Sequence, residues 1–300
     1  MNRRMFLASA ACYAAAPELM GEKKERPLFS FGLAADIQYA DKDTANGRAY
    51  RDSIGKLQKS VALWNTEDLA FVIQLGDFVD TGGLAALDRI LPIYNGARAK
   101  KYSVLGNHDF TVPRDQLLKR LNMPSAYYDF KVRNWRFIVL DGMAISVKGG
   151  WDQNDPHAKK GREVLEQLTV EHAPNATDWN GGVGVEQRQW LRRVLTDAGR
   201  KGERAIVFCH FPTLPASCRP STLLWDHEEV VAVLETQQCV AAYINGHDHQ
   251  GGYASQKGIH YLTLPAIVEH DVAESCFTAH VFPHRIVIEK MSGATQTLLI

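Results

Sequence analysis

The chain has 300 residues, of which 45% are hydrophobic and 23% are charged. This composition is that of an ordinary globular protein and excludes a disordered or collagen-like chain. The formal net charge is zero, because 34 Lys and Arg residues balance 34 Asp and Glu residues. A neutral chain has no general basic field, so we expect neither nucleic acid nor a membrane surface as its partner.

The N-terminal segment has the layout of an export signal. Arg3 and Arg4 precede a short apolar stretch, residues 6–16, and a polar run follows it. Paired arginines before such a stretch resemble the twin-arginine type of signal. We expect residues 1–21 to direct the protein to the periplasm or the exterior, and residues 22–300 to form one domain. If this interpretation is wrong, the protein is cytoplasmic.

Apolar runs of strand length alternate with stretches of helical periodicity, which is typical of a layered α/β domain. Helices are expected over residues 50–64 and 186–198, where apolar side chains recur on one face. Buried strands are expected at residues 29–35, 69–75, 102–105, 135–140, 205–209 and 240–244.

The last quarter of the chain reads as predominantly β. Short segments at residues 259–264, 277–282 and 286–290 predict antiparallel additions to a mixed sheet. Residues 141–184 are rich in Gly, Asp, Asn, His and Pro, and we expect them to form an irregular excursion over the surface. Five cysteines are present without CxxC spacing, so neither a zinc knuckle nor a thioredoxin-like motif is expected.

Side chains that can bind metal directly follow five of the expected strands. Ligands bind at the carboxyl ends of strands in open α/β sheets, so these five turns should meet at one place. Their carboxylate, amide and imidazole groups suit two divalent ions, with Asp77 shared between them. The turns are Ala35-Asp36-Ile37-Gln38, Gly76-Asp77-Phe78-Val79-Asp80, Gly106-Asn107-His108-Asp109, Cys209-His210 and Gly246-His247-Asp248-His249.

Each of these signatures is weak alone. A Gly-Asp pair is common by chance, and a single histidine at a strand end is more often a core residue than a ligand. The ordered set is a much stronger signal, because five such turns after five apolar strands do not readily arise by coincidence. Within the set, we expect Asp109 to be a turn residue and not a ligand.

The ordered set resembles the calcineurin-like metallophosphoesterases, and the resemblance covers residues 29–287. It implies an α/β fold of two mixed β-sheets packed as a sandwich and flanked by helices. Most of that family has Asp-x-His at the first motif, whereas this chain has Asp36-Ile37-Gln38. At this point, at Asn180-Gly181-Gly182 and at residues 246–253, the chain is similar to the manganese-dependent ADP-ribose/CDP-alcohol diphosphatases.

The resemblance implies a ligand set for each of two divalent ions. An amide oxygen is a harder donor than imidazole, so Gln38 shifts the preference from zinc toward manganese or magnesium. We expect Mn²⁺, with Mg²⁺, Fe or Zn²⁺ as alternatives. The implied ligands are Asp36, Gln38, Asp77 and His249 for one ion, and Asp77, Asn107, His210 and His247 for the other.

The expected reaction is attack on phosphorus by a hydroxide held between the two ions. His108 would act as the general acid for the departing oxygen, and Asp80 would orient it. Arg48 and Arg51 are candidates for contact with a second phosphate, and Tyr253 for contact with the substrate. The expected substrate is a nucleotide diphosphate such as ADP-ribose or a CDP-alcohol, split at its diphosphate bond.

Two alternatives stay open at this stage. The first is another enzyme of the same fold, namely a nucleotidase, a cyclic-nucleotide phosphodiesterase or an acid phosphatase. It would share the ions but not the leaving group, and Gln38 counts against it. The second is a non-catalytic binding module, which would be expected to have lost one or more ligands. No motif position is empty here.

Overall fold

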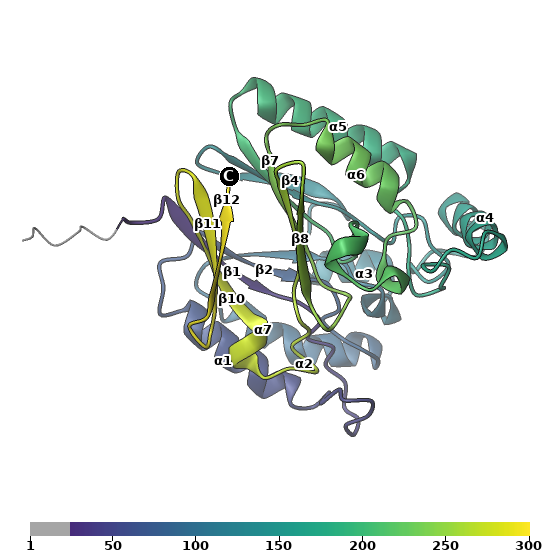
Figure 1. Ribbon diagram of the computed structural model, residues 1–300. Helices are drawn as coiled ribbons and strands as arrows, with labels where there is room; N and C mark the ends of the chain where they lie inside the picture. Colours follow the sequence, from purple (N-terminus) through teal and green to yellow (C-terminus); the bar gives the residue numbers. More distant parts are fainter. Residues whose placement is uncertain (1–24) are drawn as a thin grey trace, which may run out of the picture.

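A computed structural model describes residues 25–300, and the expected export signal at residues 1–21 lies outside the described residues. Within residues 25–300, twelve strands form two six-stranded sheets, with helices on their outer faces (Figure 1). The family resemblance implied two mixed sheets packed as a sandwich and flanked by helices, and this fold class is confirmed.

The first sheet has the order β12-β11-β10-β1-β2-β3. Three of its strands are parallel, and the chain returns at its end to add three antiparallel strands beside the first. The strands are β1 (Phe29–Ala34), β2 (Phe71–Leu75), β3 (Lys100–Val104), β10 (Cys276–Val281), β11 (Arg285–Lys290) and β12 (Thr295–Leu299).

The second sheet has the order β4-β5-β6-β7-β9-β8. Its four inner strands are parallel, and an antiparallel strand lies at each edge. The strands are β4 (Tyr128–Val132), β5 (Trp135–Val139), β6 (Arg204–Phe208), β7 (Val240–Asn245), β8 (Gly252–Gln256) and β9 (Ile259–Thr263).

The two sheets share one core of large apolar side chains. Alternate residues of the central strands point between the sheets, among them Phe31, Phe71, Phe137 and Phe208, all fully buried. The rings of Phe71 in the first sheet and Phe137 in the second meet edge to face with their centroids 4.8 Å apart. Packing of these rings fixes the two sheets against each other, and with them the strand ends that the next section describes.

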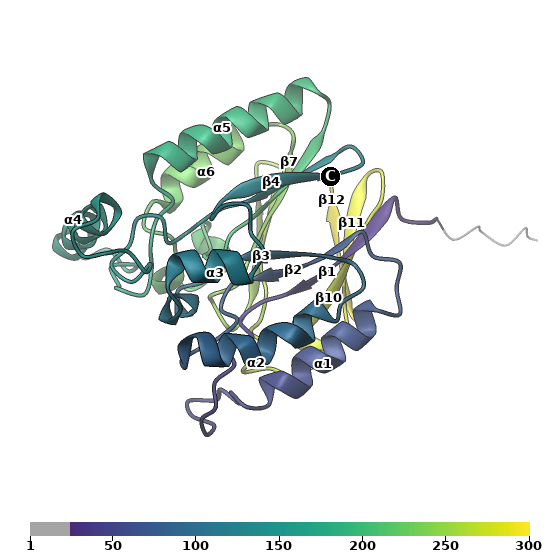
Figure 2. The ribbon, with the colours of Figure 1, turned by 180° about the vertical axis from the view of Figure 1, so that it is seen from behind.

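Amphipathic helices cover both outer faces (Figure 2). On the first sheet, α1 buries Leu57, Val61 and Trp64, the apolar face that its sequence predicts. On the second sheet, α5 buries Leu191 and Leu195 in the same way. The helices are α1 (Ser53–Trp64), α2 (Gly83–Asn95), α3 (Arg114–Arg120), α4 (Pro156–Val170), α5 (Gly184–Arg200), α6 (His227–Glu235) and α7 (Val272–Ser275).

Helix α4 corrects the expectation of an irregular segment over residues 141–184. The Asp155 side chain caps this helix by accepting the backbone N–H of His157 at 2.8 Å, and Pro156 occupies the first turn. Both features favour a helix start. The Gly- and Asn-rich residues on either side of the helix concealed this signal. The helix lies to one side of the sandwich (Figure 1).

Two further observations concern the described residues as a whole. No helix among residues 25–300 combines the length and the apolar composition needed to cross a membrane. The cysteines in the same range carry free thiols; they are Cys209, Cys218, Cys239 and Cys276.

Candidate metal centre

The five turns predicted to bind metal converge at one end of the sandwich. Three of them follow β1, β2 and β3 of the first sheet, and two follow β6 and β7 of the second. Carboxylate oxygens of Asp36 and Asp77 and a ring nitrogen of His210 all lie within 4.8 Å of one another. These three side chains are fully or almost fully buried. The centre therefore draws on both sheets at the place where their parallel strands end.

The backbone of these turns is strained in a way that aims side chains at the centre. Asp36, Gln38, Asp77 and His247 have φ angles of 54°, 44°, 59° and 67°, in the left-handed region that non-glycine residues rarely adopt. Each such residue costs about 1–3 kcal/mol and persists where the surroundings fix it. Strain of this kind clusters at functional sites, so its concentration at four predicted ligands supports a functional role.

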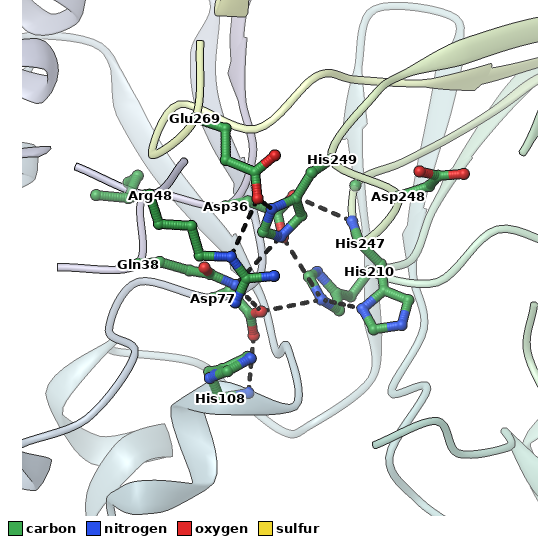
Figure 3. A network of polar contacts seen from close by, with 12 residues as sticks. Asp36, Gln38, Arg48, Asp77, His108, His210, His247, Asp248, His249 and Glu269 are labelled. Carbon is green, nitrogen blue, oxygen red and sulfur yellow. Dashed lines mark hydrogen bonds and ion pairs between the residues drawn. The ribbon is translucent and has the colours of Figure 1, made fainter. Parts of the chain in front are cut away.

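Two histidines each use one ring nitrogen for a protein contact and turn the other toward the centre (Figure 3). Nδ1 of His210 lies 2.8 Å from a backbone carbonyl of β2, and its Nε2 lies 3.4 Å from Asp77 Oδ2. Nδ1 of His249 lies 2.6 Å from Glu269 Oε1, and its Nε2 lies 3.4 Å from Asp36 Oδ1. Such partners fix the orientation of a metal-binding imidazole.

His247 uses its two ring nitrogens the other way round: Nε2 makes the protein contact, and Nδ1 faces the centre. Its Nε2 lies 2.9 Å from Asn180 Oδ1, and its Nδ1 faces Nε2 of His210 at 3.2 Å. Burial and the neighbouring positive charge of His210 hold the pKa of His247 well below its usual value. The ring is therefore neutral at physiological pH, which is the form that binds metal.

Three buried oxygen atoms at the centre have no hydrogen-bond partner among the described residues. They are Asp36 Oδ1, Gln38 Oε1 and Asn107 Oδ1. Buried polar atoms in proteins are almost always paired, so each unpaired oxygen requires an explanation. All three belong to residues that the sequence predicts as ligands, and oxygen donors beside imidazoles fit Mn²⁺ or a similar divalent ion.

Gln38 lies where a ligand to the first ion would be needed. Its Nε2 is 3.0 Å from Asp77 Oδ2 and 3.3 Å from Nε2 of His249. The two ends of an amide have the same shape, so a half-turn of the amide group places the oxygen beside these two residues. The residues present therefore fit two divalent cations, with Asp77 between them.

Carboxylates raise the proton affinity of two histidines at the centre. Burial lowers the pKa of His210, but Asp77 and Asp36 outweigh it and raise this pKa to about 9. Burial also opposes protonation of His249, whereas the neighbouring carboxylates of Asp36 and Glu269 raise its pKa to about 9. The centre thus attracts positive charge strongly, and a divalent ion must displace protons from these two rings.

His108 lies beside the predicted ligands without joining them. Its Nδ1 is 3.3 Å from Asp80 Oδ1, and its backbone N–H donates to Asp77 Oδ1 at 2.9 Å. The His108 side chain is 31% exposed and faces the pocket, whereas Asp80 is buried. Lys42 also pairs with Asp80, and Arg48 lies 4.0 Å from it. This geometry is the one required of an acid oriented by a carboxylate.

A cavity of about 760 Å³ opens over the predicted ligands. This volume lies within the ordinary range for small-molecule sites. Its lining extends from the centre to a rim of basic and aromatic side chains. The residues beyond the metal ligands are Arg48, His108, Phe110, Thr111, Lys148, Trp179, Arg219, Ser221, Thr222, Gln250 and Glu269.

Of the three predicted substrate contacts, only Arg48 lines this cavity. Arg51 pairs with Asp41 and Asp43 on the exposed surface. Tyr253 lies on β8, where its hydroxyl is 2.8 Å from His260 Nδ1. The structure therefore does not bring Arg51 and Tyr253 into this cavity, because sequence proximity to a motif does not determine which way a side chain points.

Several residues that shape the centre were not assigned to it from the sequence. Asp109 accepts backbone N–H groups of Asp77, Phe78 and Gly106 at 2.7–2.9 Å, which confirms it as a turn residue. Asn180 lies in the Asn-Gly-Gly motif and could have been found there.

Glu269 had no comparable signal. It follows its partner His249 by 20 residues and belongs to no motif. The hydrogen bond from His249, opposed by burial and assisted by Arg48, lowers the pKa of Glu269 to about 2. The Glu269 carboxylate is therefore ionised at neutral pH and can accept a hydrogen bond from His249. It also accepts a hydrogen bond from Arg48 at the pocket wall.

The fold and the centre together define a metal-dependent phosphoesterase with a two-metal site. The sequence pattern of the family described as calcineurin-like phosphoesterase matches residues 29–251, and the chain belongs to this family. A crystal structure of a dimetal phosphatase from Danio rerio superposes with a TM-score of 0.84 at 31% identity, covering 91% of this chain and 99% of that one.

Curated relatives agree with this classification. A protein of Arabidopsis thaliana named manganese-dependent ADP-ribose/CDP-alcohol diphosphatase is 37% identical over 281 residues, covering 83% of this chain and 89% of the relative. A protein of Oryza sativa subsp. japonica with the same name is 34% identical over 292 residues, covering 87% and 91% of the two chains.

Proposed function

We propose that the protein is a manganese-dependent diphosphatase whose substrates join a nucleoside to a sugar or small alcohol through a diphosphate, as in ADP-ribose and CDP-alcohols. The similar proteins from Arabidopsis and rice carry this activity in their names. The observation that carries the proposal within this chain is Gln38, an amide at a ligand position where its Oε1 is buried and unpaired.

The pocket has room for the parts of such a substrate that extend beyond the reacting phosphate. Trp179 is 47% exposed at the rim, next to Asn180, which contacts the ligand His247. A nucleobase stacked on an aromatic ring gains about 1–3 kcal/mol. A simple phosphate ester would leave this rim unused, so the pocket favours a nucleotide.

The ions supply the electrophilic part of the chemistry: when bound, they polarise a phosphoryl oxygen and lower the pKa of a coordinated water. His108 lies at the pocket edge and donates a proton to the oxygen that leaves phosphorus. Asp80 holds the ring through Nδ1, so Nε2 is the atom that faces the substrate. Water adds to one phosphorus, the bridging P–O bond breaks, and two phosphate monoesters are released.

A substrate screen tests this proposal. Purified protein in Mn²⁺ should hydrolyse ADP-ribose and CDP-choline with a higher kcat/KM than a cyclic nucleotide or an aryl phosphate, and chromatography should show a nucleoside monophosphate as one product. A preference for aryl phosphates or cyclic nucleotides would overturn the diphosphatase assignment and favour another phosphoesterase of this fold.

We also propose that the protein is exported, on the basis of Arg3, Arg4 and the apolar stretch that follows. An exported enzyme would meet extracellular nucleotide diphosphates. Fractionation of cells that express the natural chain and an Arg3→Lys/Arg4→Lys variant tests this. The natural chain should be found outside the cytoplasm and the variant inside. Equal retention of both in the cytoplasm would contradict export.

A further inference from the structure

A buried carboxylate lies between two of the predicted ligands but points away from the metal centre. Asp248 separates His247 from His249 in sequence, and its side chain turns to the opposite side (Figure 3). It is only 1% exposed. A buried carboxylate without a partner would strongly destabilise the folded protein. The contacts of Asp248 therefore indicate its role.

Asp248 binds a single arginine through both of its oxygens. Oδ2 accepts the backbone N–H of Arg219 at 2.5 Å, whereas Oδ1 accepts Nε at 2.8 Å and lies 2.7 Å from Nη2. The backbone contact fixes the position of the residue, and the two side-chain contacts fix the plane of its guanidinium. Arg219 is therefore held in one orientation by the same loop that carries two metal ligands.

Part of the Arg219 guanidinium makes no hydrogen bond to the described residues. An arginine side chain has five N–H donors, and Asp248 occupies only the edge formed by Nε and Nη2. None of the described residues accepts a hydrogen bond from Nη1 of Arg219. The side chain is 57% exposed and lines the cavity over the metal centre.

The other Lys and Arg side chains that line this cavity, Arg48 and Lys148, each pair with a different carboxylate. Arg48 donates through Nε to Glu269 at 3.0 Å and lies between this carboxylate and Asp80. Lys148 pairs with Asp178 at 2.7 Å, and both side chains are about half exposed, so water screens this pair. Arg219 combines a buried carboxylate anchor, Asp248, with a guanidinium edge that has no hydrogen-bond acceptor among the described residues.

We propose that Arg219 binds the second phosphate of the substrate, the one that is not attacked, and that Asp248 is the positioning residue that holds it for this purpose. This inference rests on the proposed function, because it assumes a diphosphate. A guanidinium presents two parallel donors to phosphate oxygens, and an arginine already fixed by Asp248 loses little freedom on binding. Arg219 would thus distinguish diphosphates from monophosphates.

Steady-state kinetics of Arg219→Ala test the inference. Hydrogen bonds to charged groups contribute about 1.5–3 kcal/mol, so kcat/KM for ADP-ribose and CDP-choline should fall by about 10- to 100-fold. Hydrolysis of p-nitrophenyl phosphate, which has no second phosphate, should change by less than about three-fold. Arg120→Ala is the matched control, because Arg120 is also exposed and paired, with Asp88, but lies outside the cavity. It should match the natural protein on all three substrates.

Asp248→Asn tests the positioning role. The isosteric amide keeps the volume but weakens the hold on Arg219, so KM for diphosphate substrates should rise while kcat and the Mn²⁺ content stay close to those of the natural protein. In a double-mutant cycle, adding Asp248→Asn to Arg219→Ala should cost little more than Arg219→Ala alone. Additive losses would show that Asp248 acts independently of Arg219 and would contradict its role.

Inhibition separates failure of this inference from failure of the proposed function. Methylenediphosphonate and inorganic phosphate are compared as inhibitors of p-nitrophenyl phosphate hydrolysis at the same free Mn²⁺. Arg219→Ala should weaken inhibition by the diphosphonate at least ten-fold and leave inhibition by phosphate unchanged, whatever the preferred substrate is. Equal inhibition of the variant and the natural protein by the diphosphonate would overturn the role of Arg219, even if the substrate screen supports a diphosphatase.

Discussion

Each predicted metal-binding histidine has one ring nitrogen in contact with the protein and the other available for a cation. The carbonyl of Leu75, Glu269 and Asn180 supply these contacts. With these contacts, His210 and His249 would present Nε2 to bound ions, and His247 would present Nδ1. The identity of the donor atom is thus determined by residues outside the ligand set, a common arrangement in metal proteins.

A first prediction concerns His108. Replacing it with Asn should lower kcat for ADP-ribose by about 10²- to 10⁴-fold, because the leaving oxygen then departs without a positioned proton donor. The Mn²⁺ content should stay unchanged, since His108 is not expected to bind the ions. The measurements are steady-state kinetics and metal analysis of the same preparation.

Asp80→Asn serves as the companion variant for this prediction. It should cause a smaller loss of kcat, because the imidazole is still present but is less well oriented. Unchanged turnover in His108→Asn would remove His108 from the mechanism. Loss of metal from that variant would instead assign it to the ligand set.

The structure brings the predicted ligands together, whereas only Arg48 among the predicted substrate contacts lines the cavity. Ligands follow strands directly, so the end of an apolar run places them to within a residue. Proximity to a motif does not predict substrate contacts in the same way. Arg51 lies close to a motif but pairs with carboxylates on the exposed surface, whereas Arg219 belongs to no motif but lines the cavity. Side-chain direction in a loop depends on tertiary contacts, such as that with Asp248, which a single sequence does not display.

At the scale of elements, glycines in the strand-end turns allow the backbone to approach the carboxylates of the centre closely. A Cβ at Gly106 would lie 2.1 Å from Asp77 Oδ1, and one at Gly246 would lie 2.4 Å from Asp36 Oδ2. Both distances are far below van der Waals contact. These glycines therefore keep open the space in which the carboxylates meet the ions.

A second prediction follows for Gly246→Ala. The new methyl group must displace the Asp36 carboxylate, so the variant should bind Mn²⁺ at least ten-fold more weakly and lose most of its activity. Gly199→Ala is the control, because this glycine lies within α5 with nothing within 4 Å of the added Cβ. The control should keep full activity and gain about 0.5–1 kcal/mol of stability. Normal metal binding by Gly246→Ala would contradict the packing argument.

The sequence predicted many elements with a clear apolar pattern, although it missed α2, and it did not predict elements with mixed patterns. The six buried strands and the helices α1 and α5 were expected within a few residues of their bounds. Strand β8 has mostly exposed or half-exposed residues, and α4 is largely polar, so neither shows a strong apolar period. Such elements are stabilised by neighbouring strands or by caps, which are weaker signals in the sequence than burial.

At the scale of the whole molecule, the metal centre joins the two sheets. Asp36, Asp77 and Asn107 follow strands of the first sheet, whereas His210 and His247 follow strands of the second. Ions held by both groups would cross-link the sandwich at this end, so binding should stabilise the folded protein. The chain as a whole is neutral, so the positive charge needed for an anionic substrate must be local. Bound divalent ions would supply part of it, and Arg48 and Arg219 at the cavity would supply the rest.

A third prediction concerns pH. The pKa values of His210 and His249 are raised to about 9, from an ordinary value of about 6.5. In chelator-treated protein, the resulting stabilisation is fully present below about pH 6.5 and is lost as the pH rises through about 9. Divalent ions must displace these protons, so metal affinity should increase over the same range.

Anaerobic Mn²⁺ titrations between pH 6.5 and 9 measure this effect. The logarithm of the affinity should rise with pH at a slope approaching about two, one for each histidine. Thermal unfolding of the chelated protein should show the opposite trend, with Tm falling as pH rises. An affinity that does not change with pH would mean that these rings are not ligands.

The central claim is that the five turns hold two divalent ions with Asp77 between them. Metal analysis of the folded protein after Mn²⁺ loading, combined with electron paramagnetic resonance, tests it most directly. We predict about two Mn²⁺ per chain and an exchange-coupled signal, because ions that share one carboxylate lie about 3.5–4 Å apart. Saturation at one Mn²⁺ per chain, with only the six-line signal of an isolated ion, would contradict the account.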